Sequence, residues 1–256
     1  MEIVLLGSGN IATHLGKALK MAGQSITQVW SRNYERATEL ADSVGAKAVK
    51  EPSQITATAG LYLLAVNDDA IRTVAEQLNV ANGLIVHTSG STGLEVLDGI
   101  STRTGVFYPI QTFSKSKAVD LRQVPIAVEG SSAEVTDILH SLASRISEKI
   151  FEMNSVKRRT VHTAAVFACN FTNHMYVLAQ KLLKEQNLSL DLLRPLIAET
   201  ALKIQSADPA SVQTGPAVRE DNSTMEMQMQ LLKDNPDLQD LYEKLSQSII
   251  NYQKIS

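Results

Sequence analysis

Apolar residues follow two different spacings along the chain, and the change between them falls after residue 152. Before it, short unbroken apolar runs alternate with stretches in which apolar residues recur every three or four positions. Unbroken runs are typical of strands buried on both faces, and the wider spacing is typical of amphipathic helices. Because the two alternate, the sequence predicts an α/β fold with a doubly wound sheet and right-handed crossovers. The expected strands are residues 3–6, 26–30, 46–49, 61–66, 84–86, 106–107, 124–128 and 146–151.

From residue 154 onward the pattern is helical throughout. Apolar residues of modest size recur at helical spacing from Val161 to Leu182, which favours close contact between helices. A second helix is expected to begin after Ser189, a third at the capping-box pattern of residues 223–226, and a last one at Pro236. The sequence therefore predicts two domains, an α/β domain of residues 1–152 and an all-α domain of residues 153–256.

The first expected strand leads directly into a glycine turn, GSGNIA at residues 7–12, and then into a helix. Gly7 permits a tight turn, and Gly9 has no Cβ, so a pyrophosphate can approach the N–H groups at the helix N-terminus. Ala12 takes the place of the third glycine, where strand and helix pack closely. This strand–turn–helix context predicts a dinucleotide-binding Rossmann fold. Its first cofactor contacts are expected at Gly7, Ser8, Gly9, Asn10 and Ile11.

The end of the second expected strand favours NADP(H) over NAD(H). In NAD-binding folds an acidic residue at this point bonds the ribose 2′-OH, whereas a cation accommodates the 2′-phosphate of NADP. Here Ser31 is followed by Arg32, and residues 24–33 contain no carboxylate. A guanidinium can bind phosphate and stack on adenine. The alternative interpretation is a solvated surface arginine.

Two further expected strands, residues 61–66 and 84–86, end at the same edge of the sheet. Open parallel sheets bind their ligands at this edge. The hydroxyl groups after residues 84–86 suit hydrogen bonds to the nicotinamide, or they only turn the chain. Asp68 and Asp69 are expected to cap a helix rather than to take part in catalysis. The cofactor contacts predicted at these two ends are Ala65, Val66, Asn67, Thr88 and Ser89.

Charge and composition exclude several kinds of partner. A formal net charge of −3 gives no general attraction to nucleic acid or to an acidic membrane, and no apolar run approaches the roughly 20 residues that span a bilayer. We therefore expect a small-molecule substrate. The single cysteine, Cys169, fits a reducing compartment, and the first residues lack a signal-peptide pattern, so a cytoplasmic location is expected. No histidines and carboxylates are spaced as metal ligands.

Five segments, given at the end of this paragraph, carry a resemblance to a known family. With these segments in this order, the chain resembles the 6-phosphogluconate dehydrogenase-like superfamily, which includes pyrroline-5-carboxylate reductases and β-hydroxyacid dehydrogenases. Over nearly the whole chain it resembles more closely the Rossmann-like short-subunit NADP oxidoreductases whose C-terminal domain has no assigned function. The resemblance implies an NADP(H) domain followed by a helical domain that supplies a substrate site and a homodimer interface. The segments are GSGNIA at 7–12, HTSGS at 87–91, YPIQTF at 108–113, HTAAVFACN at 162–170 and TGPAVRED at 214–221.

The helical half supplies the candidates for catalysis and substrate binding. His162 and Asn170 are about two helical turns apart, and His174 follows one turn later. A histidine that faces the cleft can transfer a proton while the nicotinamide carries the hydride. The alternative is a hydrogen-bonded core histidine. Asn170 is expected to position a ligand, and His174 to bind substrate. Arg219 and Asp221 are expected to hold a substrate carboxylate or to pair with each other across a dimer.

Several positions differ from the families that the chain resembles. β-Hydroxyacid dehydrogenases have a catalytic lysine one turn before the asparagine, and here Val166 stands there. Tyr108, Glu220 and Gln228 replace the histidine of a His-Pro pair, the glycine of an Arg-Gly-Asp segment and a later histidine. Two hypotheses follow. The chain transfers a hydride between NADP(H) and a small carbonyl or imine, or it binds NADP(H) without turnover, as a sensor or assembly subunit.

Overall fold

The computed structural model describes residues 1–80, 83–114 and 117–255 of the chain. It divides into two compact units, Met1–His174 and Met175–Ser256. The expected domain boundary at residue 152 falls at the end of the last strand, and the first compact unit continues to His174 with the helical segment that follows.

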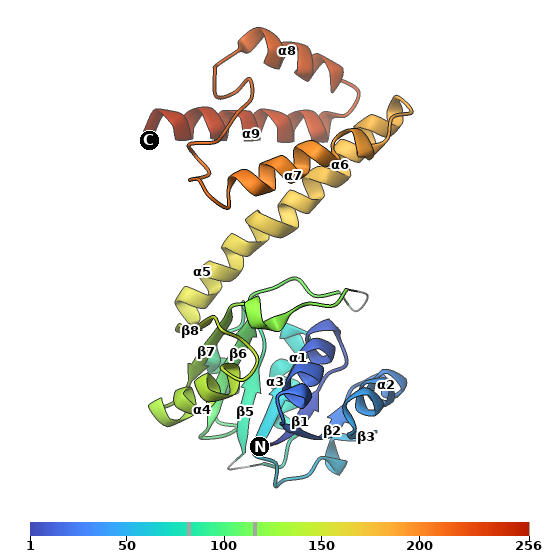
Figure 1. Ribbon diagram of the computed structural model, residues 1–256, viewed down its shortest axis with the longest axis vertical. Coiled ribbons are helices and arrows are strands. Elements are labelled where there is room, and N and C mark those ends of the chain that lie inside the picture. Colours follow the sequence, from blue (N-terminus) through green and yellow to red (C-terminus); the bar gives the residue numbers. More distant parts are fainter. Residues whose placement is uncertain (81–82, 115–116, 256) are drawn as a thin grey trace. The chain divides into compact units, whose positions relative to one another are not determined.

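An eight-stranded sheet forms the body of the first unit, in the order β3-β2-β1-β4-β5-β6-β7-β8 (Figure 1). All neighbouring pairs are parallel except β6 with β7. The predicted doubly wound sheet is therefore confirmed, with one antiparallel pair that was not expected. The strands are β1 (Glu2–Leu6), β2 (Ser25–Trp30), β3 (Lys47–Val49), β4 (Leu61–Leu64), β5 (Leu84–His87), β6 (Thr104–Pro109), β7 (Ile126–Gly130) and β8 (Ile150–Glu152).

The antiparallel pair has a local cause in the connection between its strands. In the described part of residues 110–125, the one regular element is a short 3₁₀ turn, Leu121–Gln123. A parallel pair needs a crossover of a dozen or more residues, usually with a helix that carries the chain back along the sheet. Without such a helix the chain returns directly, and β7 runs against β6.

Alternate residues of each strand face opposite sides of the sheet, and both sides are covered. In β1, Ile3 and Leu5 belong to one apolar cluster, whereas Val4 and Leu6 belong to another. Because both faces are buried, the strands need apolar residues at every position, which explains their unbroken runs. The first cluster includes residues of α1 (Asn10–Met21), α2 (Tyr34–Val44) and α4 (Ala133–Ala143), and the second includes residues of α3 (Ile71–Glu76) and the 3₁₀ helix η3 (Leu94–Leu97).

The expected capping role of Asp68 and Asp69 is wrong. Both residues lie in a 3₁₀ turn, Asp68–Ala70, and within the described ranges neither this turn nor α3 receives a side-chain cap at its N-terminus. The Asp68 carboxylate instead accepts a hydrogen bond from the hydroxyl of Ser91, which follows the neighbouring strand β5. The 3₁₀ turn makes α3 begin after these carboxylates, so they do not reach its first N–H groups.

The helical part begins with one long segment interrupted by a π-turn. Helix α5 (Ser155–Ala165) passes into a π-helical stretch, Val166–Phe171, and then into α6 (Thr172–Glu185). A π-turn closes its hydrogen bonds at i→i+5 and adds a residue to the turn. The α-helical period from His162 through Asn170 to His174 is therefore broken. After it come the 3₁₀ helix η6 (Leu190–Leu192) and helices α7 (Arg194–Lys203), α8 (Asn222–Leu231) and α9 (Pro236–Ile255).

The capping box expected at residues 223–226 is replaced by an earlier cap. Asp221 precedes α8, and its carboxylate accepts hydrogen bonds from the backbone N–H and the hydroxyl of Thr224. Ser223 donates its hydroxyl to the same carboxylate. Asp221 therefore already stabilises the N-terminus of a helix.

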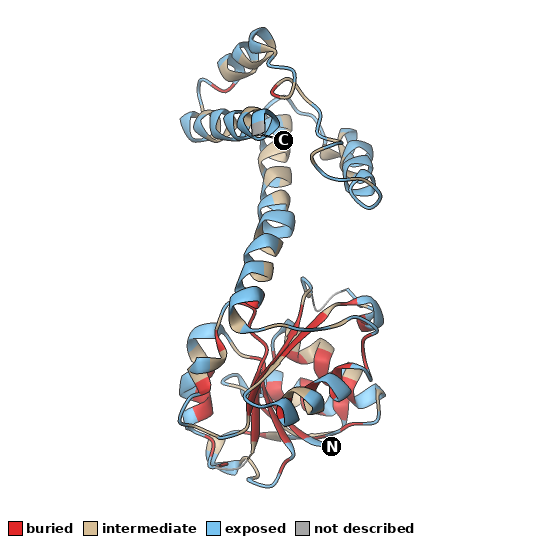
Figure 2. Ribbon diagram, turned by 90° about the vertical axis from the view of Figure 1, so that its left-hand side faces the viewer, coloured by how far each residue is buried: buried red, intermediate tan, exposed pale blue. Residues whose placement is uncertain are grey.

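Buried residues are concentrated in the sheet and its covering helices (Figure 2). In the second compact unit, Ala217 and Leu232 are the only buried apolar residues among those described. Across the ranges that the structure describes, no helix has the length and apolar character needed to cross a membrane.

Candidate functional site

The glycine turn between β1 and α1 leaves a bare helix N-terminus at the carboxyl edge of the sheet. Gly7 has φ +121°, and a Cβ there would collide with the carbonyl oxygen of Ala65, so only glycine fits. At Gly9 the opposite holds, because no described atom lies within 4 Å of the place a Cβ would take. Gly7 makes the close turn, and Gly9 keeps open the space above the first N–H groups of α1.

Helix α1 differs from the other long helices of the sheet domain in how it begins. Among the described residues it has no side-chain cap and no acidic residue in its first turn. By contrast, Asn33 caps α2, Ser132 caps α4 and Asn154 caps α5. The first N–H groups of a helix need acceptors, and the dipole favours an anion there. The start of α1 therefore fits a phosphate group.

The next strand end places a cation beside this turn. The hydroxyls of Ser8 and Ser31 are hydrogen-bonded at 2.9 Å, which holds the end of β2 against the glycine turn. Arg32 follows Ser31 and is exposed, with no ion-pair partner in the described part of the chain. An exposed, unpaired guanidinium at this point fits the 2′-phosphate of NADP.

The segment after β6 lies against the start of α1. Asn10 donates its side-chain amide to the carbonyl of Phe113 at 2.7 Å. His14 contacts the carbonyl of Ser114 at 2.9 Å, and its ring lies 4.9 Å from that of Phe113. The Asn10 side chain is therefore engaged within the protein, while its backbone remains part of the open helix start.

The remaining predicted cofactor contacts at strand ends differ in burial, and two of them are held by hydrogen bonds within the protein. Ala65 is buried, Val66 is half-buried and Asn67 is exposed. Thr88 and Ser89 are buried: the Thr88 N–H donates to the carbonyl of Leu64, and the Ser89 hydroxyl accepts from the N–H groups of Ser91 and Thr92. The two predicted nicotinamide-binding hydroxyls therefore already support the turn. Ile11, at the start of α1, is half-buried.

His87, at the end of β5, is a fully buried histidine that sequence reasoning did not single out. Burial, together with the Arg158 charge, lowers its pKa to about 4, so it is neutral near pH 7. Its Nδ1 accepts the N–H of Ser89 at 3.2 Å, which places the proton on Nε2. Nε2 makes no hydrogen bond of ordinary geometry among the described residues, although the nearby backbone of Gly93 opposes the lowering of the pKa.

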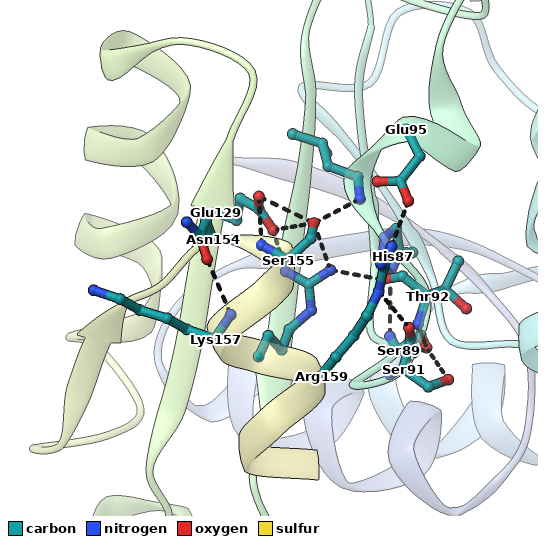
Figure 3. A network of polar contacts seen from close by, with 12 residues as sticks. His87, Ser89, Ser91, Thr92, Glu95, Glu129, Asn154, Ser155, Lys157 and Arg159 are labelled. Atoms are coloured by element: carbon teal, nitrogen blue, oxygen red, sulfur yellow. Dashed lines mark hydrogen bonds and ion pairs between the residues drawn. The ribbon is translucent and has the colours of Figure 1, made fainter. Parts of the chain in front are cut away.

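Two consecutive arginines hold α5 against the sheet domain (Figure 3). Arg158 is fully buried, forms an ion pair with Glu129 of β7 and donates to the carbonyl of Thr92 at 2.6 Å. Glu129 also accepts the N–H of Ser155 at 2.9 Å. Arg159 forms an ion pair with Glu95 and donates to the carbonyl of Ser91. Sequence reasoning missed this anchor, whose only sequence signal is that Arg158 lies one helical turn before His162.

This anchor brings His162 to the carboxyl edge, where it meets Tyr108 of β6. The Tyr108 hydroxyl and His162 Nδ1 are hydrogen-bonded at 3.1 Å, and the rings meet edge to face at 5.9 Å. Gly90 lies against both, since a Cβ there would come within 2.6 Å of Tyr108 Cζ and 2.7 Å of His162 Nδ1. Of the helical candidates, His162 is therefore the one with a recorded contact at this edge.

The other helical candidates differ from His162 in their exposure or in the unit that contains them. Asn170 and His174 are exposed, the first within the π-turn and the second in α6. Arg219 and Asp221 belong to the second compact unit. Hydrogen bonds from Thr224 and Ser223 lower the pKa of Asp221, with a small contribution from the Arg219 charge. No group of three or more potential metal ligands occurs among the described residues.

Comparisons with known proteins agree with this arrangement. A family described as "NADP oxidoreductase coenzyme F420-dependent" matches residues 2–89, and a domain of unknown function matches residues 124–249. A crystallised protein of Bacteroides fragilis, described as a candidate NADP oxidoreductase, is 42% identical, with 98% of each chain covered and a TM-score of 0.89. No match was found among the curated proteins.

More distant structures share the fold. An imine reductase of Myxococcus stipitatus in complex with NADP⁺ is 13% identical, with 99% of this chain and 93% of that chain covered and a TM-score of 0.66. A reductive aminase of Aspergillus terreus in complex with NADPH and ethyl-5-oxohexanoate is 14% identical, with 98% of each chain covered and a TM-score of 0.70. The resemblance expected from the five sequence segments is confirmed. The chain belongs to the Rossmann-like NADP oxidoreductases that carry this C-terminal domain of unknown function.

Proposed function

We propose that this protein transfers a hydride between NADP(H) and a small carbonyl or imine substrate. The observation that carries the proposal is the open, uncapped N-terminus of α1 at Gly9, at the same sheet edge as the Tyr108–His162 pair. The first feature suits a pyrophosphate, and the second offers a group that can move a proton. Distant relatives crystallised with NADP⁺ or NADPH are an imine reductase and a reductive aminase, which supports this substrate class by analogy.

The cofactor is assigned to four strand ends. The N–H groups of Ser8 to Ile11 are suited to the pyrophosphate, and Arg32, supported by Ser31, to the 2′-phosphate of the adenosine. The main chain from Ala65 to Asn67 and the loop at Thr88 and Ser89 form the neighbouring wall. Bound NADPH supplies the hydride, so the chain itself has to provide a proton and to orient the substrate.

We assign proton transfer to His162 and ligand positioning to Asn170. His162 is half-buried, and among the described residues its recorded polar partner, Tyr108, contacts Nδ1 only. Its Nε2 is therefore available to a substrate. Asn170 in the exposed π-turn and His174 are the further candidates for substrate contact in the first unit. Arg219 and Asp221, in the second unit, are candidates for holding a substrate carboxylate. Of these, Asp221 is the weakest candidate because it caps α8.

A homodimer formed through the helical domain is part of the proposal. The second unit buries only Ala217 and Leu232 among its described apolar residues, and Leu196, Leu202, Met227 and Leu231 are each more than 60% exposed. Exposed apolar surface on this scale is typical of an interface. We expect a dimeric mass by light scattering at micromolar concentration, and a monomeric mass would contradict this part of the proposal.

Calorimetric titration with NADPH and NADH tests the cofactor assignment. Arg32→Ala is expected to weaken NADPH binding by about 10-fold or more and to leave NADH binding unchanged, because the lost contact is charge-assisted and specific to the 2′-phosphate. Arg145→Ala is the matched control, since Arg145 is another exposed arginine of the first unit that forms no recorded ion pair in the described residues. Equal loss for both cofactors would contradict the role of Arg32.

Gly9→Val tests the phosphate site itself. With φ −76° and open space at Cβ, valine fits the fold, so its side chain is expected to block the cofactor without lowering the unfolding temperature. NADPH consumption is measured with a panel of aldehydes, ketones and imines. Full activity in Gly9→Val, or no binding of NADP(H) by the wild type, would remove the cofactor assignment.

A second function is favoured by one residue. Val166 stands where β-hydroxyacid dehydrogenases carry a catalytic lysine, which favours a sensor or assembly subunit that binds NADP(H) without turnover. This alternative predicts thermal stabilisation by NADPH, no NADPH oxidation with any member of the panel, and full tolerance of His162→Ala.

A further inference from the structure

The hydrogen bond between Tyr108 and His162 suggests a role for a tyrosine outside the predicted site residues. We propose that Tyr108 positions His162 as the proton donor of the reduction: the phenol donates its O–H to Nδ1, so that the neutral imidazole carries its proton on Nε2, available to the substrate. The inference rests on the proposed function and deepens it. Tyr108 acts through His162 and is a positioning residue.

The direction of this hydrogen bond follows from the surroundings of Tyr108. Burial raises the pKa of the phenol and the charges of Asp68 and Cys169 act in the same direction, whereas Arg158 opposes them. The phenol therefore keeps its proton near neutral pH. A protonated phenol can donate its O–H across the 3.1 Å to Nδ1, and this is the proposed direction of the hydrogen bond, with Nδ1 as the acceptor. Nε2 then bears the N–H and has no partner among the described residues.

The path of α5 explains why His162 arrives at Tyr108. Arg158 is bound to Glu129, and Glu129 lies opposite Val106 in the sheet. From Arg158 to His162 the helix rises about 6 Å. From Val106 to Tyr108 the strand advances about 6.6 Å. These two lengths are similar, and the Arg158–Glu129 ion pair fixes α5 one helical turn before His162.

A merely structural hydrogen bond is a weaker explanation. Helix α5 is already held by Arg158 and Arg159, so the Tyr108 hydroxyl is not needed to attach it. Gly90 also leaves no room for a side chain beside the two rings. An arrangement that a single methyl group would disturb is expected where the orientation of the imidazole matters.

The proposed proton movement balances. The substrate carbon gains a hydride from NADPH, which is oxidised to NADP⁺, and the carbonyl oxygen or imine nitrogen takes the proton from His162 Nε2. As that bond breaks, Nδ1 takes the Tyr108 proton, which leaves a tyrosinate. Water then protonates Nε2, and Nδ1 returns its proton to the tyrosinate, which restores the starting tautomer. Without the phenol, Nδ1 has no proton to take up as Nε2 gives up its own, so the transfer is slower.

The test combines a tautomer measurement with a measurement of kcat. Long-range ¹⁵N–¹H spectra of the five histidines, assigned with His162→Gln, report which His162 nitrogen carries the proton. We expect Nε2–H in the wild type and a mixed tautomer in Tyr108→Phe and Gly90→Ala. In Tyr108→Phe, kcat is expected to fall at least about 10-fold, as for loss of general acid catalysis.

Tyr62→Phe is the matched control. Tyr62 is another buried tyrosine of the sheet domain, and its hydroxyl donates to the carbonyl of Thr56 at 2.7 Å, away from the proposed site. It is expected to leave the His162 tautomer and kcat unchanged. Fluorescence of Trp30, the one tryptophan, verifies folding of every variant.

Two results would overturn the inference: a proton on Nδ1 of His162 in the wild type, or an unchanged tautomer in Tyr108→Phe. The outcome is separable from that of the proposed function. If the wild type oxidises no NADPH with any substrate, the proposed reduction fails, whereas the spectra still decide whether Tyr108 orients His162.

Discussion

The two compact units differ in how far they bury their apolar side chains. In Met1–His174 the sheet is covered on both faces, and strand residues such as Leu5 and Leu6 are fully buried. In Met175–Ser256 most described apolar residues are exposed or half-buried, and Leu231 is 79% exposed (Figure 2). A sheet layer closes its own core, whereas a set of helices with single apolar stripes needs another surface to cover them. The difference teaches that the first unit has a core of its own, whereas the second leaves apolar side chains exposed, which the proposed homodimer would cover.

Removal of the buried guanidinium is expected to have the largest effect. Arg158→Met leaves Glu129 without its partner and should lower the free energy of unfolding of the first unit by about 3 to 5 kcal/mol. Urea unfolding followed by Trp30 fluorescence measures it. Arg159→Met is the neighbouring control, because the side chains of Arg159 and Glu95 are 46% and 62% exposed. Its expected cost is below about 1 kcal/mol. Equal losses of unfolding free energy in the two variants would mean that the burial of Arg158 adds nothing to stability.

Truncation of a core leucine compares the two units directly. Leu5→Ala should lower the free energy of unfolding by about 3 to 4 kcal/mol, because it leaves a cavity in a packed core. Leu231→Ala should change the Trp30 transition by less than about 0.5 kcal/mol. If Leu231 is covered by a second copy, its truncation should instead weaken the dimer, which dilution in light scattering would reveal. If Leu5→Ala lowered the free energy of unfolding only slightly, the conclusion that the first unit has a tightly packed core would be wrong.

The buried imidazole of His87 makes the stability of the first unit depend on pH. Its folded pKa of about 4 lies below the ordinary value of about 6.5, so the unfolded state takes up a proton first as the pH falls. This stability is complete above pH 6.5 and is lost towards pH 4. Its size is on the order of 3 kcal/mol.

His87→Gln provides the control, since glutamine does not titrate in this range. The wild type should lose more stability between pH 7 and pH 4 than the variant, by the amount assigned to His87, when both are unfolded in urea. The neighbouring charges of Arg158, Asp68 and Glu95 are the same in both proteins, so their titration cancels in the difference. Parallel pH curves would contradict a depressed pKa for His87.

Helix caps give the smallest expected effect. Ser132 accepts the N–H of Val135 at the start of α4, and Ser132→Ala should cost about 1 kcal/mol in the Trp30 transition. Ser141→Ala, on the exposed side of the same helix, is the control and should be neutral. Asp221→Ala removes the cap of α8 in the second unit and should reduce helicity without moving the Trp30 transition. A shift of that transition would show that the units unfold together.

Local patterns were enough to predict most of the sheet domain. The run at residues 3–6 became β1, the stripe of Ala37, Leu40 and Ala41 became the buried side of α2, and Gly45 ended that helix in the left-handed conformation. The glycine turn was predictable because Gly7 and Gly9 meet constraints within a few residues of chain. Signals of this kind depend on spacing along the sequence, which the amino acids determine by themselves.

The candidate site was less predictable because it is assembled from distant segments. His162 was singled out by residue type, but its partner Tyr108 is 54 residues away, and Arg158 meets Glu129 across 29 residues. The expected cap at Asp68 or Asp69 failed for the same reason, since Asp68 meets Ser91, 23 residues away. The cap expected at Ser223 failed for a local reason, because Asp221, two residues earlier, caps the helix instead.

The sequence by itself determined the alternation of strands and helices, the glycine turn and the change to a helical second half, because apolar spacing and backbone freedom are local properties. Only the tertiary structure decided that β7 runs against β6, that a π-turn breaks the helix after Ala165, and that His162 meets Tyr108. Those features depend on which surfaces lie side by side after folding, and no spacing along the chain encodes that proximity.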